Sequence, residues 1–246
     1  MKRIIFILMT LLLIFAMIGC DSEDTITNTS STQSEPDTSI TDDNDEKEQY
    51  IPFSHTKNGV DEFYTLFQET MHNYDMKQYL KEKCYNVTPQ EVSEATDAKI
   101  FKFYDNSASF VLIDNEIYEI CHYFGGYGFI NAVPCDFDGD GSVELLVASS
   151  WGSGLHRSEI SIFDLTDKSF EICYSTQDLS SAGNYIELVV QSKENNDGTV
   201  TYELYSVDYK SALVGDSFTL AYKIIELHGI IEIIDGVPTF KPATIE

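Results

Sequence analysis

The chain has 246 residues, with 15 Lys and Arg against 41 Asp and Glu, so its formal charge is −26. This excess of acid excludes nucleic-acid binding, which needs clustered basic side chains to neutralise phosphates. Nucleotide binding is not expected either, because no glycine-rich loop follows a strand and opens a helix. With 43% hydrophobic residues the chain can still bury a core, so its charge does not indicate global disorder.

The chain opens with a leader typical of export. Lys2 and Arg3 precede an uncharged, mostly apolar run that ends at Gly19. A basic start, a short apolar run and a small residue predict a signal peptide over residues 1–19. Residues 17–20, Met-Ile-Gly-Cys, resemble the lipobox of bacterial lipoproteins. The resemblance implies a lipid on Cys20 and a place on the outer face of the bacterial cytoplasmic membrane, with an uncleaved anchor or ordinary secretion as alternatives.

A polar segment separates the leader from the rest of the chain. Residues 21–50 contain ten acids, one lysine and many Ser and Thr, and such a composition cannot bury a core. We therefore expect residues 20–50 to be a lipidated cysteine followed by a disordered acidic tether. Residues 51–246, with 12 basic and 31 acidic residues and a formal charge of −19, are expected to form a single α+β extracytoplasmic domain.

Two helices are predicted at the start of this domain. Apolar residues recur every three or four positions from Val60 to Tyr74, which is one face of a helix. Asn73 and Asp75 are expected to end it, with a shorter helical piece to about residue 83. Thr88-Pro89-Gln90-Glu91 has the composition of a helix start with Thr88 as its cap, and predicts a short helix to about residue 96.

Beyond residue 99 the apolar period changes to two, which predicts strands. The clearest turns are Asn196-Asp197-Gly198, His228-Gly229 and Asp235-Gly236. The run 143–148 is apolar on both faces and predicts a central strand. The fold class is therefore α+β: short N-terminal helices, then a mainly antiparallel sheet region with about one propeller-blade-like unit. The expected strands are 100–103, 109–113, 117–121, 128–133, 143–149, 159–165, 169–174, 185–191, 199–207, 218–226 and 230–234.

Four cysteines remain after Cys20. Outside a membrane they could form two disulfides, and otherwise they would be buried thiols that act as small apolar groups. Their spacing contains no C-x-x-C, so neither redox nor zinc chemistry is expected. The four are Cys84, Cys121, Cys135 and Cys173.

The most informative segment is DFDGDGSVE, residues 136–144. Its acids stand at relative positions 1, 3, 5 and 9, with a glycine at position 6. Carboxylates crowded on one tight loop repel each other unless a hard divalent cation binds, and Ca²⁺ accepts six to eight oxygens. An EF-hand is disfavoured because position 12 is Val147, inside an apolar run. The alternative without an ion is an acidic turn.

This segment resembles the calcium loop of FG-GAP and VCBS-type repeats, which form the blades of integrin α-subunit propellers and occur in many bacterial surface proteins. The likeness extends more weakly over residues 125–165, about one blade, and the chain also resembles uncharacterised clostridial-type surface lipoproteins. Glu144 stands where the family has Asp. The resemblance implies a Ca²⁺ site made by the side chains of Asp136, Asp138, Asp140 and Glu144 and the carbonyl of Ser142.

Four further residues are candidates for ligand binding. Tyr127 and Trp151 could present flat aromatic faces to a sugar, although aromatics among strands more often fill a core. His156 and Arg157 could bind an anion or supply a base, although such residues more often pair with nearby acids. Ser153 lacks the glycine and the following helix of a nucleophile elbow, so no catalytic residue is assigned.

These features favour a non-enzymatic, membrane-anchored module that binds an envelope protein or a glycan, with a structural Ca²⁺ loop. One alternative is a calcium-stabilised surface hydrolase with a site near the loop from Trp151 to Arg157. The other is an accessory lipoprotein that docks a membrane complex through the helix at Val60–Tyr74.

Overall fold

The computed structural model describes residues 50–121, 125–137, 139–153, 156–176, 186–214, 217–234 and 237–243, with the backbone alone for 211–214 and 217–219. These residues belong to one compact unit, Lys47–Glu246. Its helices are α2 (Val60–Thr70) and α3 (Gln90–Ala95), with the 3₁₀ turns η1 (Met76–Gln78) and η2 (Lys81–Lys83). Its strands are β1 (Ile51–Pro52), β2 (Cys84–Asn86), β3 (Lys99–Phe103), β4 (Ser109–Ile113), β5 (Glu116–Ile120), β6 (Gly128–Cys135), β7 (Glu144–Trp151), β8 (Arg157–Asp164), β9 (Phe170–Ser175), β10 (Glu187–Glu194), β11 (Val200–Val214), β12 (Ser217–Ile234) and β13 (Val237–Pro242).

The strands form three antiparallel sheets, none of which closes on itself in the described part of the chain. The first has the order β2-β3-β4-β5, and the second has the order β6-β7-β8-β9. The third has the order β1-β12-β11-β10, with β13 also paired to β12. The molecule is therefore mostly antiparallel β-structure, which the expected α+β class describes only loosely.

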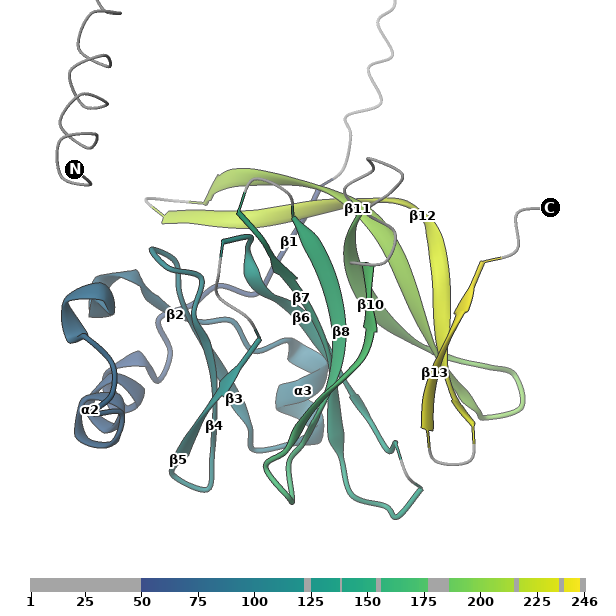
Figure 1. The fold of residues 1–246 in the computed structure, drawn as a ribbon, viewed down its shortest axis with the longest axis horizontal. Helices are drawn as coiled ribbons and strands as arrows, with labels where there is room; N and C mark the ends of the chain where they lie inside the picture. The colour runs from purple at the N-terminus through teal and green to yellow at the C-terminus, as the bar shows by residue number, and fades with distance from the viewer. Residues whose placement is uncertain are drawn as a thin grey trace, which may run out of the picture. The chain divides into compact units, whose positions relative to one another are not determined.

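The sheets and α2 stack in layers, as Figure 1 shows, with the sheet β6–β9 between the other two. Alternate residues of β7 face opposite sides of this middle sheet. Leu146 belongs to the core shared with β10–β12, and Leu145 to the core shared with β3–β5 and α3. Both faces of β7 are buried, as the continuous apolar run predicts.

A third core lies between α2 and the outer face of the sheet β2–β5. Val60, Phe63 and Phe67 are the buried residues of α2, and they pack on aromatic residues of β3 and β4. The spacing of apolar residues predicted this face, and that prediction is confirmed. Because the face is used inside the domain, it is not available to dock a membrane partner.

The start of α3 differs from the expected one. Pro89, not Thr88, is the residue before the helix, and no side chain caps it. The Thr88 hydroxyl instead donates to Asn86 Oδ1 at 2.6 Å and accepts the N–H of Ile100 at 2.8 Å. Thr88 therefore joins the helix start to β3 rather than capping the helix.

The hairpins are confirmed in part. Asn195 N–H donates to the Thr199 carbonyl at 2.8 Å, which closes the turn at 196–198 between β10 and β11. The turn expected at His228-Gly229 is wrong, because both residues lie inside β12. Gly229 is needed for close packing instead: a Cβ there would lie 2.4 Å from the Lys241 carbonyl and from the Phe240 ring of β13. The turn at 235–236 lies outside the described residues.

The four cysteines beyond the tether are free thiols. Burial raises the pKa of each to about 12, so the thiolate forms are strongly disfavoured. They are the free thiols of the second alternative given above, two buried and two partly buried, and not a disulfide framework. The four residues are Cys84, Cys121, Cys135 and Cys173.

Candidate functional site

The loop of residues 136–144 joins β6 to β7 at one end of the middle sheet. Asp136 organises its first half, because its carboxylate accepts the N–H of Gly139 at 2.8 Å and that of Gly141 at 3.2 Å. Both glycines have φ values in the left-handed region, 76° and 88°, which few other residues adopt without strain. The chain therefore curls around the Asp136 carboxylate.

The second half of the loop is held by two more carboxylates. Asp140 Oδ1 accepts the N–H of Ser142 at 2.6 Å, and Glu144 Oε2 accepts the N–H of Phe137, also at 2.6 Å. Glu144 is buried, with 4% of its surface exposed, whereas Asp140 is exposed. Glu144 thus ties the end of the loop back to its beginning. Asp138, the remaining expected ligand, lies outside the described residues.

The donors of this loop fit a hard cation. In the described part, which lacks Asp138, no three Asp, Glu, His or Cys side chains converge to metal-binding distance. The donors present are nevertheless all oxygens, and a carboxylate that accepts one N–H per oxygen keeps further lone pairs. None of the ion pairs between described residues includes Asp136.

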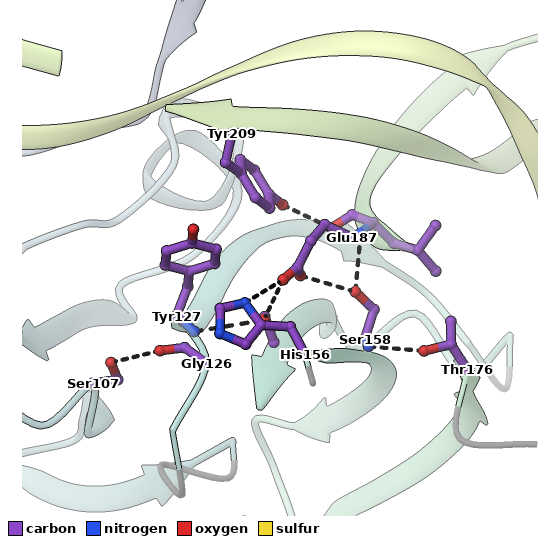
Figure 2. A network of polar contacts seen from close by, with 10 residues as sticks. Ser107, Gly126, Tyr127, His156, Ser158, Thr176, Glu187 and Tyr209 are labelled. Atoms are coloured by element: carbon purple, nitrogen blue, oxygen red, sulfur yellow. Dashed lines mark hydrogen bonds and ion pairs between the residues drawn. The ribbon is translucent and has the colours of Figure 1, made fainter. Parts of the chain in front are cut away.

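A second polar cluster surrounds Glu187 at the start of β10 (Figure 2). Its side chain is 12% exposed and lies 2.8 Å from His156 Nδ1. Ser150 Oγ donates to the same carboxylate at 3.0 Å and Ser158 Oγ at 3.4 Å. Burial raises the pKa of the Glu187 carboxyl, and the bonds from Ser150 and His156 partly oppose this rise. The carboxylate therefore links β7 and β8 to β10.

Two tyrosines complete the cluster around His156. The ring of Tyr127 meets the imidazole edge-on, with centroids 5.0 Å apart, and meets Tyr209 at 5.4 Å. Burial raises the pKa of both tyrosines, so both stay neutral at physiological pH. Of the candidate ligand-binding residues, the structure brings Tyr127 and His156 together.

The other two candidates form a separate pair. Trp151 and Arg157 are cross-strand neighbours on β7 and β8, and the guanidinium carbon lies 5.1 Å from the centre of the Trp151 ring. The glycine just before Tyr127 is required by packing. A Cβ on Gly126 would lie 2.5 Å from Trp151 Cα, so glycine is needed there for the close approach of two backbones.

The cluster has half of the geometry of a nucleophilic site. When Glu187 is ionised its carboxylate only accepts hydrogen bonds, so His156 Nδ1 is then the donor and Nε2 is the nitrogen left to act as a base. A nucleophile would have to lie within hydrogen-bond reach of that nitrogen. Among the described residues, neither Ser153 nor any other hydroxyl or thiol hydrogen-bonds to His156. His156 is an oriented base without an identified partner.

The loop and the His156 cluster lie at opposite ends of β7. Asp136 precedes the Glu144 end of that strand, whereas His156 precedes Arg157, the cross-strand neighbour of Trp151 at the other end. Eight strand residues at about 3.3 Å each separate them by about 25 Å. Calcium in the loop would therefore be too distant to take part in chemistry at His156.

Sequence reasoning missed Glu187, although a signal was available. It is the single acid in the apolar stretch Ile186-Glu187-Leu188-Val189-Val190, and an acid placed there has to find buried partners. The stretch alone could not show that those partners are Ser150 of β7, Ser158 of β8 and His156.

Two cavities open along the side of the domain where β6 and β10 are edge strands. The larger, cavity 1, has a volume of about 870 Å³ and lies between β1, α3, β6 and β10. The smaller, cavity 2, has a volume of about 600 Å³ and is bordered by Asp136 of the acidic loop. Ser192 of β10 lines both cavities.

Comparison with known proteins gives no match: no family model fits the chain, and no curated protein and no solved structure is significantly similar to it. Among the described residues, no helix is both long and apolar enough to cross a membrane.

Proposed function

We propose that the chain is a lipid-anchored extracytoplasmic lipoprotein whose folded domain is a non-enzymatic binding module with a structural Ca²⁺ loop. The observation that carries the proposal is the Asp136 loop, in which backbone N–H groups already hold the carboxylate in place. A Ca²⁺ ion would be held by the side chains of Asp136, Asp138, Asp140 and Glu144 and by the carbonyl of Ser142. Bound there, the ion would neutralise the crowded carboxylates and stiffen the junction of β6 and β7.

The likeness to one propeller blade belongs to this proposal. The four strands β6–β9 follow one another as an antiparallel meander, and the acidic loop lies between the first two. The partner of the module would be an envelope protein or a glycan. The domain's charge of −19 favours a partner with positive or no charge and disfavours contact with anionic headgroups.

Calcium binding is tested by titration calorimetry on the mature chain, residues 20–246, with Cys20→Ser to omit the lipid. The parent is expected to bind Ca²⁺ with a dissociation constant of about 10⁻⁴–10⁻³ M, the range of extracellular modules. Asp136→Asn should abolish the heat, because it removes one charge and one shared acceptor. Asp167→Asn, at an exposed turn, is the matched control. Equal heats from the parent and Asp136→Asn would reject the site.

The anchor is tested by growth with a clickable fatty acid. Label is expected on the full-length protein, and it should disappear in Cys20→Ala because the thiol is the expected acceptor. A protein that carries no label, or that keeps its label after this substitution, would refute the lipoprotein assignment and leave calcium binding untouched.

A second candidate function is a hydrolase near the loop from Trp151 to Arg157. The observation in its favour is the contact of 2.8 Å between His156 Nδ1 and Glu187, since an oriented histidine is half of a general-base site. The missing nucleophile and the distance of about 25 Å from the calcium loop place it second.

A further inference from the structure

The outer edge of β10 points its backbone groups in a regular pattern. β10 is the last strand of its sheet and pairs with β11 from Glu187 to Glu194 without a bulge. In such a ladder, alternate residues direct their N–H and C=O groups away from the partner strand. Val190 is one of them, because its N–H donates to Asn131 Oδ1 at 3.1 Å and its carbonyl accepts from Asn131 Nδ2 at 2.6 Å. Leu188, Ser192 and Glu194 therefore also face outward.

Only the first half of this edge is covered. The N–H of Leu188 donates to Ser158 Oγ at 2.9 Å, and its carbonyl accepts from the Tyr209 hydroxyl at 3.1 Å. The side-chain amide of Asn131 bonds both the N–H and the C=O of Val190, as the backbone of a neighbouring strand would. Within the described residues, no hydrogen bond engages the outward N–H and C=O groups of Ser192 and Glu194. An open strand edge is a template on which another chain can pair, so this stretch is a candidate binding edge.

A pocket for a side chain lies beside the open stretch. Cavity 2 is bordered by Ser192 and Glu194 and by their cross-strand neighbours Tyr202 and Val200. Its wall is partly apolar and includes two exposed side chains: Val200 is 49% exposed and Ile233 is 36% exposed. Main-chain groups next to a side-chain pocket are the two elements with which proteins bind an added strand.

Acidic side chains around the open edge and cavity 2 form a rim whose negative charge indicates what kind of ligand binds there. Glu91 of α3 reaches the edge, where its carboxylate accepts from Ser192 Oγ at 3.3 Å, and Asp136 and Glu194 border cavity 2. A second copy of the domain would bring another charge of −19 to this place. Repulsion between the two negative surfaces disfavours self-association. The same negative charge attracts a cationic ligand.

We propose that the open edge at Ser192 and Glu194 binds an extended peptide as an added antiparallel or parallel strand. Its backbone pairs with these two residues, and an apolar side chain enters cavity 2. Basic residues two positions before and after it, which lie on the same face of the strand, face the acidic rim. This inference rests on the binding role proposed above and names its ligand. Because Asp136 borders the same cavity, calcium bound in the loop would lower the negative charge at the rim. Calcium would therefore weaken the binding of a basic peptide.

The test uses the mature chain, residues 20–246 with Cys20→Ser, and the fluorescein-labelled peptide Thr-Lys-Thr-Val-Thr-Lys-Thr, in which both Lys lie on the same face as Val; binding is followed by fluorescence anisotropy. Ser192→Pro removes the outward N–H but no bond to β11, so the strand should remain folded, which circular dichroism verifies. We expect Ser192→Pro to weaken binding by about tenfold and the matched variant Ser192→Ala by less than about twofold. The same peptide with alternate N-methylated residues should bind as weakly as Ser192→Pro does.

Several outcomes would overturn the proposal. They are no binding of the peptide at millimolar concentration, equal binding by Ser192→Pro and Ser192→Ala, and equal binding of the same peptide with Glu in place of both Lys. Self-association seen by sedimentation, or retention of an N-acetylglucosamine trimer in place of the peptide, would assign the edge to another occupant. Calorimetry with Ca²⁺ gives a separate result, so a failed peptide test leaves the calcium proposal standing, and the reverse holds.

Discussion

Phe67→Ala is expected to lower the free energy of unfolding by about 3–5 kcal/mol. Phe67 is fully buried, and it lies at the centre of the core between α2 and the sheet β2–β5. Its ring centroid is 5.0 Å from that of Phe110, 5.2 Å from Phe103 and 5.4 Å from Tyr79. Truncation would leave a cavity among rings that are too large to move into it.

Urea unfolding followed by circular dichroism measures this effect. Ile225→Ala on β12 is a suitable control, because that side chain is 58% exposed and its truncation should cost less than about 1 kcal/mol. A loss below about 1 kcal/mol in Phe67→Ala would mean that α2 is not held to the sheet by this core.

Lys102→Met is expected to raise the free energy of unfolding at pH 7 by about 2 kcal/mol. Lys102 points from β3 into the layer next to β6 and is 3% exposed, and its Nζ donates to the Phe129 carbonyl at 2.9 Å. None of the ion pairs between described residues includes it. Burial lowers the pKa of Lys102 from 10.5 to about 8, a shift that the nearby Cys121 thiol slightly opposes.

The lowered pKa of Lys102 means that its charged form destabilises the folded state. Below pH 8 both states are protonated, and the folded protein bears the full cost of a buried ammonium, about 3 kcal/mol. Between pH 8 and 10.5 the unfolded chain binds more protons, so the stability contributed by Lys102 rises with pH. Methionine avoids the cost but leaves the Phe129 carbonyl without its donor, which offsets about 1 kcal/mol.

Urea unfolding at pH 7 and pH 10 distinguishes this account from a simple loss of packing. The advantage of Lys102→Met over the parent should be largest at pH 7 and shrink at pH 10. Lys99→Met, at an exposed position of the same strand, should change stability little at either pH. A variant that is less stable than the parent by the same amount at both pH values would contradict the prediction.

The sequence predicted those parts of the fold that depend on local periodicity. The spacing of Val60, Phe63 and Phe67 identified the buried face of α2, and the apolar run at 143–148 identified a strand buried on both faces. Both patterns report on burial directly, because a residue's neighbours on one face recur at fixed intervals. The order of the layers could not be obtained in this way, since it depends on which faces meet.

Local signals failed where tertiary packing decided the outcome. His228-Gly229 has the composition of a turn, yet Gly229 lies inside β12, where the paired strand β13 leaves no room for a side chain. Thr88 has the composition of a helix cap, yet its hydroxyl bonds Asn86 and Ile100. In both cases contact with a neighbouring strand decided the role of the residue: β13 for Gly229, and β3 through Ile100 for Thr88.

The candidate sites also differ in how far the sequence alone could predict them. The acidic loop is contiguous in sequence, so its spacing alone pointed to an oxygen-rich site, and the hydrogen bonds of Asp136 agree with a curled loop. The cluster of His156 with Glu187 and the open edge of β10 are each made by segments far apart in the chain. Such sites become visible only when the strands are placed side by side.

The most direct test of the central claim is a crystal structure of the mature chain grown with Ca²⁺, with the ion located by its anomalous scattering. We predict one ion in the loop of residues 136–144, with oxygen ligands at about 2.3–2.6 Å from the expected acids and from the Ser142 carbonyl. A well-ordered loop with no anomalous peak at millimolar Ca²⁺, and with the Asp136 carboxylate bonded only to backbone N–H groups, would contradict it.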